Sequence, residues 1–194
     1  MAGVVAVQWQ KIRSVMLGVA GLQAAYSLAL IYNVQTAQQL PVLFGQVSAE
    51  DYQAARISFY RPAQKINELL KDGGRVALYD EVFGALLKVP YTWANPGHSM
   101  LFEYDKMAGG EDLVARMRQL SHTHLYFNLT NPEVRAGFLQ GGMPEELRAR
   151  LAGDKQVQWI PLIEDAERKG LIERVEMFST QPDRPPYAIL YRIR

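Results

Sequence analysis

The chain has 194 residues, with 21 Lys and Arg against 20 Asp and Glu, three His and no Cys. The lack of cysteine excludes a disulfide framework and a cysteine metal site, and the balanced charge argues against a nucleic-acid partner held by bulk positive charge. A hydrophobic content of 48% also excludes wholesale disorder. The charges are unevenly distributed, because no Asp, Glu, Lys, Arg or His occurs between Arg13 and Glu50. The sequence therefore indicates two regions: a hydrophobic one that contains the uncharged stretch, and one with the charged surface of an ordinary soluble domain.

The uncharged stretch predicts a transmembrane helix over about residues 14–34, within a membrane segment of residues 1–43. Gln23 is the one strongly polar residue of positions 15–32, and closely spaced Gly and Ala residues would let other membrane helices pack against this one. At about 1.5 Å per residue the helix spans roughly 31 Å, which matches a hydrocarbon core of about 30 Å. A buried core helix and a cleaved signal peptide are the alternatives, although the apolar run is long for a signal peptide.

The charges that flank this stretch predict its orientation. Lys11 and Arg13 precede it, and no positive charge follows until Arg56. By the positive-inside rule, the amino-terminal side lies in the cytoplasm. We therefore expect residues 44–194, the bulk of the chain, on the extracytoplasmic side of the inner (plasma) membrane.

Helical and strand patterns alternate over residues 44–194. Helices are predicted over 48–60, 63–71, 82–87, 111–120 and 154–169, and strands over 75–79, 124–129, 171–179 and 187–193. Residues 90–98 are expected to be irregular, the glycine-containing stretch 137–144 is expected to be a polar connection, and Pro161 is expected to kink or break its helix. The Pro-rich stretch 181–186 suggests a hairpin loop. The fold class predicted is α/β: an N-terminal transmembrane helix followed by a small α/β sandwich with a C-terminal β-hairpin.

Several short motifs follow the transmembrane stretch in a fixed order. They are LPVLFGQVSAEDYQAARISFYRPAQKINELLKDGGRVALYDE at 40–81, VPYTWANPGH at 89–98, SHTHLYFN at 121–128 and ILYRIR at 189–194. This order resembles the carboxy-terminal part of bacterial polytopic glycosyltransferases related to dolichyl-phosphate-mannose protein mannosyltransferases and aminoarabinose transferases. The resemblance covers roughly residues 14–194 through short, degenerate motifs.

The resemblance implies a membrane enzyme that transfers a sugar from a polyprenyl-phosphate donor, with membrane lipid, the lipid-linked sugar and a glycan acceptor as partners. The family's catalytic acids lie in its first extracytoplasmic loop, whereas no acidic residue precedes Glu50 here. We therefore expect the C-terminal part of such an enzyme, inactive alone, with no catalytic residue and no cofactor. The alternatives are a single-pass membrane-anchored α/β domain that binds a glycan or a partner without catalysis, and a soluble enzyme with a buried N-terminal helix.

Two acids form the first candidate site. Asp80 and Glu81 follow directly on the predicted strand 75–79, where open α/β sheets place ligand-binding loops. Paired acids at this place could bind a sugar hydroxyl or a divalent ion. The alternative is that they only supply favourable charge at the start of the next helix.

The loop that follows supplies the other candidate substrate-binding residues. Tyr91, Trp93, Asn95 and His98 combine aromatic faces with amide and imidazole donors, which suits stacking on a sugar ring and hydrogen bonding to its hydroxyls. The alternative is that both aromatic residues pack in the core or on the membrane while the Asn-Pro-Gly sequence forms a turn.

Two histidines and one asparagine are weaker candidates. His122 and His124 would face the same way on a strand and could form half of a metal site, but the sequence offers no evident third ligand, and no metal site is predicted. Asn128 begins a formal N-glycosylation motif, which we interpret as accidental because it ends a predicted buried strand.

Overall fold

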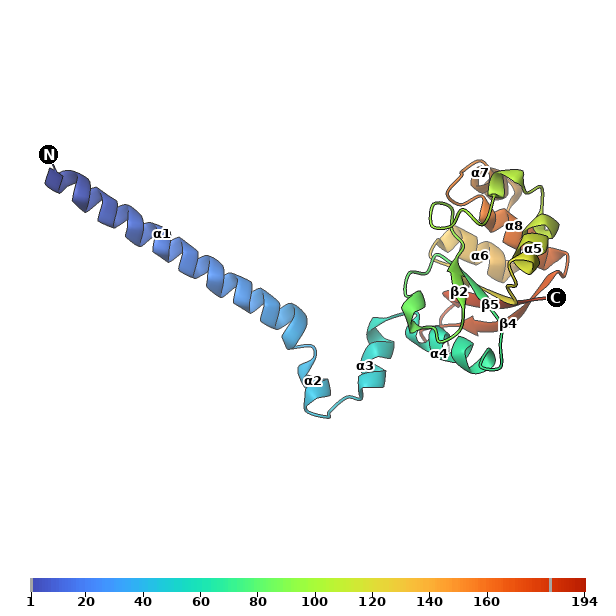
Figure 1. Ribbon diagram of the computed structural model, residues 1–194, viewed down its shortest axis with the longest axis horizontal. Coiled ribbons are helices and arrows are strands. Elements are labelled where there is room, and N and C mark those ends of the chain that lie inside the picture. The colour runs from blue at the N-terminus through green and yellow to red at the C-terminus, as the bar shows by residue number, and fades with distance from the viewer. Residues whose placement is uncertain (1, 182) are drawn as a thin grey trace. The chain divides into compact units, whose positions relative to one another are not determined.

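The computed structural model describes residues 2–181 and 183–194, without the side chains of residues 2–8, 10, 11 and 35. The chain divides into two compact units, of which the first ends at Arg56 and the second is Ile57–Arg194. Figure 1 shows the helices and strands of both units. The two units are described separately.

The first unit is built on one long helix. Its elements are α1 (Ala2–Ile31), a π-helical turn (Tyr32–Thr36), α2 (Leu40–Leu43) and α3 (Ala49–Arg56). The stretch Ile12–Val34 is long and apolar enough to cross a membrane, and none of its most apolar window is buried. The predicted helix of membrane-spanning length is therefore confirmed, and a buried core helix does not fit this exposure.

The start of α3 is capped as its sequence suggests. The backbone N–H of Asp51 donates to the Ser48 hydroxyl oxygen at 3.0 Å, and the hydroxyl donates to the Asp51 carboxylate at 2.7 Å. The expectation that this helix continues through Tyr60 is wrong, because α3 ends at Arg56. Phe59 is instead fully buried in the second unit, where it packs just before the next helix.

The second unit contains a five-stranded sheet with the order β2-β1-β3-β5-β4. The strands are β1 (Val76–Tyr79), β2 (Tyr91–Trp93), β3 (His124–Asn128), β4 (Ile172–Phe178) and β5 (Ala188–Ile193). β1 pairs in parallel with β2 and β3, whereas β5 pairs antiparallel with β3 and β4. The predicted mixed α/β class is confirmed.

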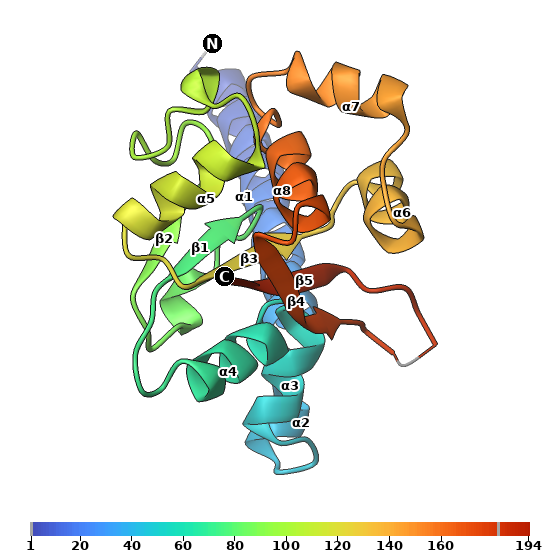
Figure 2. The same ribbon diagram turned by 90° about the vertical axis from the view of Figure 1, so that its right-hand side faces the viewer.

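Helices cover both faces of this sheet. They are α4 (Tyr60–Leu69), α5 (Gly110–Gln119), α6 (Pro132–Gln140), α7 (Glu145–Ala152) and α8 (Trp159–Arg168). Figure 2 shows α4 on one face and α5 and α8 on the other. Because side chains alternate along a strand, Val76 and Leu78 of β1 pack with the α4 core, while Ala77 and Tyr79 pack with the larger core of the opposite face.

Helices α5 and α8 approach closely through a glycine. Gly110 begins α5, and a Cβ atom at this position would lie 2.3 Å from the backbone nitrogen of Ala166 in α8. No side chain fits at such a distance. The glycine therefore sets the spacing of the two helices in the larger core.

Strand β2 was not expected from the sequence. Residues 90–98 were predicted to be irregular, yet Tyr91–Trp93 pairs with β1 at the edge of the sheet. A strand of three residues is too short for its alternation of side chains to be recognised in the sequence. Its partner lies earlier in the chain, so its pairing depends on the tertiary fold.

The stretch 137–144, predicted to be a polar connection, contains the end of α6, which runs to Gln140, and the link to α7, which begins at Glu145. The Asn131 side chain caps α6 by accepting hydrogen bonds from the backbone N–H groups of Glu133 and Val134. Gly141 ends the helix with a φ of 91°, a left-handed conformation that glycine adopts readily. Gly141 therefore marks the end of α6 and Pro144 directly precedes α7, whereas Gly137 lies inside α6.

Helix α8 also begins later than predicted. It starts at Trp159 instead of residue 154, which places Pro161 in its first turn. A first-turn residue needs no intrahelical acceptor for its N–H group, so this proline requires no break. The expectation of a break at Pro161 is wrong.

Candidate functional site

The sheet has a topological switch point between β1 and β3. From β1 the chain passes through the short 3-10 turn Gly84–Leu86 to β2 on one side, and then through α5 to β3 on the other side of β1. In open α/β sheets, ligands bind outside the carboxyl ends of the strands beside such a point. We call residues 80–83, 94–98 and 128–131, which follow β1, β2 and β3, the carboxyl edge.

Asp80 and Asn95 are joined directly at the carboxyl edge. The backbone N–H of Asp80 donates to Asn95 Oδ1 at 2.8 Å, and Asn95 Nδ2 donates to Asp80 Oδ1 at 2.6 Å. Asp80 adopts a φ of 54°, a region that Asp tolerates better than most residues. The second carboxylate oxygen of Asp80 has no hydrogen-bond partner among the described residues.

Glu81 is buried at the same edge. It exposes 5% of its surface, and its Oε1 accepts hydrogen bonds from the backbone N–H groups of Val82 at 2.8 Å and Phe83 at 2.9 Å. The helix predicted over 82–87 is only a short 3-10 turn, so Glu81 orders its own loop instead of the start of a helix.

Burial dominates the electrostatics of both acids. Burial raises the pKa of Asp80, and the hydrogen bond from Asn95 offsets only part of this change. Burial likewise raises the pKa of Glu81 against the two backbone hydrogen bonds. Neither carboxylate forms a salt bridge among the described residues. Both groups therefore remain acceptors that a ligand hydroxyl or cation would stabilise.

Two buried tyrosines, Tyr79 and Tyr104, support the loop that follows β2. The Tyr104 hydroxyl donates to the backbone carbonyl of Ala94 and lies 3.0 Å from the Tyr79 hydroxyl, and all three residues are buried. The Tyr79 ring also packs on Trp159 of α8 with ring centroids 4.6 Å apart. The position of Asn95, one residue later, is therefore fixed by the core.

The aromatic candidates of the β2 segment differ in exposure. Trp93 exposes 41% of its surface and lies edge-on to Tyr91, with ring centroids 5.4 Å apart. Tyr91 is half-buried and covers Gly84, where a Cβ atom would lie 2.4 Å from its ring. Trp93 is thus free to stack on a ligand, whereas Tyr91 mainly packs.

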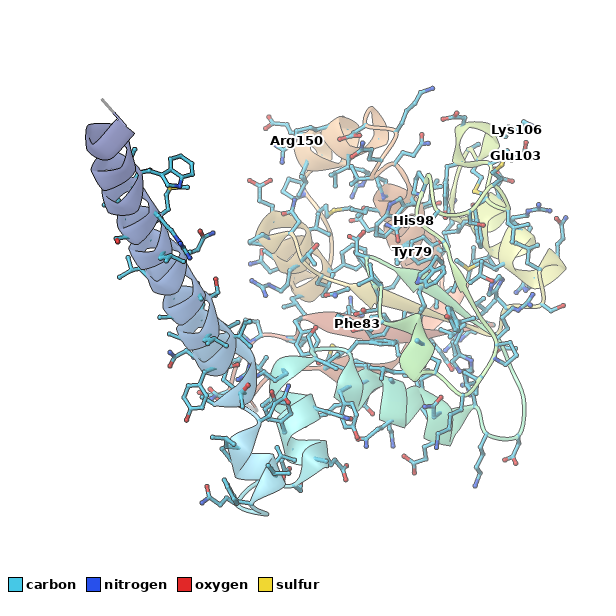
Figure 3. All side chains as sticks on the ribbon, turned by 60° about the vertical axis from the view of Figure 1, so that its left-hand side comes forward. Tyr79, Phe83, His98, Glu103, Lys106 and Arg150 are labelled. Carbon is cyan, nitrogen blue, oxygen red and sulfur yellow. The ribbon has the colours of Figure 1, made fainter. Side chains whose placement is uncertain are left out.

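His98 closes the loop after β2. Its backbone N–H donates to the Asn95 carbonyl at 3.1 Å, and Gly97 has a φ of 83°, so residues 95–98 form the expected turn. The imidazole is exposed. Figure 3 labels Tyr79, Phe83 and His98, which come from β1 and from the loops after β1 and β2.

The carboxyl edge is equipped for binding polar hydroxyl groups. It offers the Asp80 carboxylate and the Asn95 amide, and the exposed indole of Trp93 lies at the end of β2 directly before it; carbohydrate sites combine such polar groups with an aromatic face. Within the described part of the chain, no three His, Cys, Asp or Glu side chains converge as a metal site would require.

The two strand histidines lie at the opposite end of β3. His122 exposes 3% of its surface, and neither of its ring nitrogens has a hydrogen-bond partner within the described residues, while His124 Nδ1 lies 2.9 Å from the Thr123 hydroxyl. Burial and the positive charge of Arg75 lower the pKa of His122 to about 4. The structure thus separates both histidines from the carboxyl edge.

Sequence reasoning missed three tyrosines, Tyr104, Tyr126 and Tyr187, that pack in or against the two cores of the second unit. Tyr126 is fully buried, its hydroxyl has no hydrogen-bond partner among the described residues, and burial, followed by smaller contributions from Tyr187 and Glu81, raises its pKa. The Tyr187 hydroxyl donates to the Ser58 carbonyl at 2.7 Å. The sequence predicts strand β3, but no local pattern reveals that the Tyr126 hydroxyl is buried without a partner.

No protein-family model, curated protein or solved structure matches the chain. The function is therefore inferred from the helix of membrane-spanning length and from the carboxyl edge.

Proposed function

We propose that the chain is the carboxy-terminal, non-catalytic part of a membrane glycosyltransferase that uses a polyprenyl-phosphate-linked sugar donor. In this proposal α1 anchors the chain in the plasma membrane and the α/β domain lies on the extracytoplasmic side. The carboxyl edge binds the sugar of the lipid-linked donor or of a glycan acceptor. The motif order described above supplies the glycosyltransferase context.

The observation that carries the proposal is the joined pair of Asp80 and Asn95, together with the exposed Trp93 two residues before Asn95. A rigid acceptor and amide suit sugar hydroxyls, and an exposed indole suits the apolar face of a sugar ring. Rigid positioning also lowers the entropic cost of binding. Both loops are held by strand pairing and by the buried hydroxyl of Tyr104.

The proposal places the chemistry outside the residues described. The resemblance puts the catalytic acids in a first extracytoplasmic loop, and no acidic residue precedes Glu50. At the carboxyl edge, Glu81 is occupied by the backbone of its own loop. We therefore assign Asp80, Asn95 and Trp93 to binding and assign no catalytic residue.

A second candidate function is a single-pass anchored domain that binds a glycan or a protein partner outside any enzyme. The exposed apolar side chains of Val82, Phe83 and Met100 favour a partner surface. This candidate predicts binding that needs no other part of a transferase. It also predicts no effect of the chain on sugar transfer.

The test is a binding titration of the full chain in lipid nanodiscs with a panel of oligosaccharides and polyprenyl-phosphate sugars. We expect saturable binding that Asp80→Ala and Trp93→Ala each weaken about tenfold, since each removes a contact to the ligand. Asp72→Ala is the matched control, because Asp72 is exposed before the amino end of β1. Equal binding by all variants, or no glycan binding at all, would overturn the proposal. Sugar transfer by this chain alone would contradict the assignment of catalysis elsewhere.

A further inference from the structure

The first unit contains a cavity of about 400 Å³ directly after the stretch of membrane-spanning length. Leu40, Val42 and Leu43 from α2 line it on one side, and Ala49 lines it from the start of α3. The remaining lining is polar but uncharged and consists of Thr36, Gln39, Tyr52 and Gln53. This cavity is open on its outer side, and its volume leaves room for part of a hydrocarbon chain, since about 150 Å³ is enough for a benzene molecule in an enclosed apolar cavity.

The absence of charge continues beyond the helix. The stretch of membrane-spanning length ends at Val34, but the next charged residue is Glu50. Both α2 and the turn that follows it lie in this uncharged interval. A segment in bulk water would not need to exclude charge in this way, whereas a segment at the edge of the hydrocarbon would.

Large apolar side chains of this interval point away from the protein. Leu43 exposes 77% and Phe44 exposes 69% of its surface, and α2 has no buried residue. Leaving such side chains in water forfeits the hydrophobic stabilisation that lipid would provide. They are therefore suited to contact with acyl chains.

Charges return directly after Ala49, which lines the cavity. Glu50 and Asp51 lie in the first turn of α3, where the positive end of the helix dipole favours them, and Ser48 caps the same turn. The apolar lining thus comes mainly from α2, and the first charges after it lie in the first turn of α3. This order of groups matches the change from hydrocarbon to headgroup across the membrane boundary.

We propose that residues 36–53 form a lipid-binding element at the membrane surface, in which the cavity between α2 and α3 holds a segment of a membrane lipid's hydrocarbon chain. Leu43 and Phe44 lie among neighbouring acyl chains, and the Gln39 and Gln53 amides face the ester and headgroup region. The inference rests on the membrane anchoring in the proposed function. It is independent of glycan binding by the second unit.

The position of the element can be measured by spin labelling, because the chain contains no native cysteine. The full chain is reconstituted in phosphatidylcholine and phosphatidylglycerol vesicles with one label at Leu22→Cys, Leu43→Cys or Ala55→Cys. Accessibility to oxygen and to a water-soluble nickel chelate is compared for each label. We expect the labels at 22 and 43 to favour oxygen and the label at 55, on exposed α3 surface, to favour nickel.

The three labels separate failure of the inference from failure of the anchoring. If the label at 22 favours nickel, α1 is not in lipid, and both the anchoring and this inference are wrong. If the label at 22 favours oxygen but the label at 43 favours nickel, only this inference is wrong. Low accessibility of the label at 43 to both reagents would show a protein partner there and would also overturn it.

Occupancy of the cavity needs a second measurement. Ala49→Trp fills the cavity, whereas Ala55→Trp adds the same side chain to the exposed surface of the same helix. With a phospholipid that carries a nitroxide on its acyl chain, we expect Ala49→Trp to reduce the immobilised lipid fraction at least about threefold. Ala55→Trp should leave it unchanged. Equal immobilisation by Ala49→Trp and the native chain, or equal loss in both variants, would overturn the proposal.

Discussion

Two buried glutamates of the second unit show how the surroundings decide the use of a carboxylate. Glu81 at the carboxyl edge and Glu164 in α8 expose 5% and 7% of their surfaces. Burial alone would raise the pKa of both. Glu164, however, accepts hydrogen bonds from Arg148 and from the backbone N–H of Met143, and together these lower its pKa below the usual range.

Glu81 has only the N–H groups of its own loop, and its pKa stays raised. A buried carboxylate with a cation partner is a structural element whose loss is costly. One without a cation is a cost to folding that a ligand could relieve. The buried carboxylate of α8 thus contributes to the stability of the fold. The buried carboxylate of the carboxyl edge has no cation partner within the described residues that would do the same.

The largest loss of stability is expected for Gly110→Ala, which tests the packing of α5 against α8. The new Cβ atom would meet the backbone of Ala166, which cannot move without separating α5 from α8. We expect a loss of about 3 kcal/mol in the free energy of unfolding. Urea unfolding of the full chain in detergent micelles, followed by the fluorescence of buried Trp159, measures it. In the control Gly153→Ala the nearest contacts are at an ordinary 3.6 Å, and an equal loss there would refute the packing argument.

The ion pair of α8 gives the next largest effect. Glu164→Gln should destabilise the unit by about 2 kcal/mol, because it removes the buried charge that pairs with Arg148 and leaves that side chain, of which 27% is exposed, with only exposed Glu145 as an ionic partner among the described residues. The same urea titration measures this loss, and replacing both residues by Met should recover much of it. Arg150→Ala removes an exposed pair with Glu133 and should cost under about 0.5 kcal/mol. Similar losses for both pairs would remove the distinction between buried and exposed ions.

His122→Leu should stabilise the unit by about 1 kcal/mol at neutral pH. The imidazole buries two nitrogens without partners, and leucine has a similar volume without polar atoms. Because the pKa of His122 is lowered to about 4, the native chain should lose stability as the pH falls from the unfolded-state value of 6.5 toward 4, and the variant should not lose this part. A destabilised variant would show that the imidazole has a partner in solution.

The smallest effect concerns Glu81 itself. Glu81→Gln keeps an oxygen for the backbone N–H groups and removes the charge. A raised pKa in the folded state means that stability present at low pH is lost as the pH rises through that pKa. The variant should therefore gain stability over the native chain at pH 7 and not at pH 4, as measured by paired urea titrations. A gain at pH 4 alone would reverse the sign and contradict the raised pKa.

Local patterns were sufficient to predict part of the fold. The uncharged run gave the helix of membrane-spanning length, and the apolar runs gave β1 and β3. Strand β2 was missed because three residues at an edge are defined by pairing with β1. Helix α6 was missed because Gly137 was interpreted as a sign of a loop, although it lies inside the helix where Met143 leaves no room for a Cβ atom.

The candidate site could be predicted only residue by residue. The rule for strand ends indicated Asp80, and loop composition indicated Asn95. Their mutual hydrogen bonds join residues from different strands and have no local signal. The same holds for Tyr104, whose hydroxyl reaches the carbonyl of Ala94. These hydrogen bonds join segments that are separate in the sequence. They arise from the tertiary fold, and the spacing of hydrophobic residues does not predict them.

The strand order has a consequence for how the second unit forms during synthesis. β5 is the last described strand in the chain, yet it lies inside the sheet between β3 and β4. Until residues 188–193 leave the ribosome, the edge of β3 that pairs with β5 is unpaired, and β4 has no strand to pair with. The sheet can therefore be completed only after nearly all of the unit has been translated. Until then the nascent chain exposes an unpaired strand edge that is prone to aggregation.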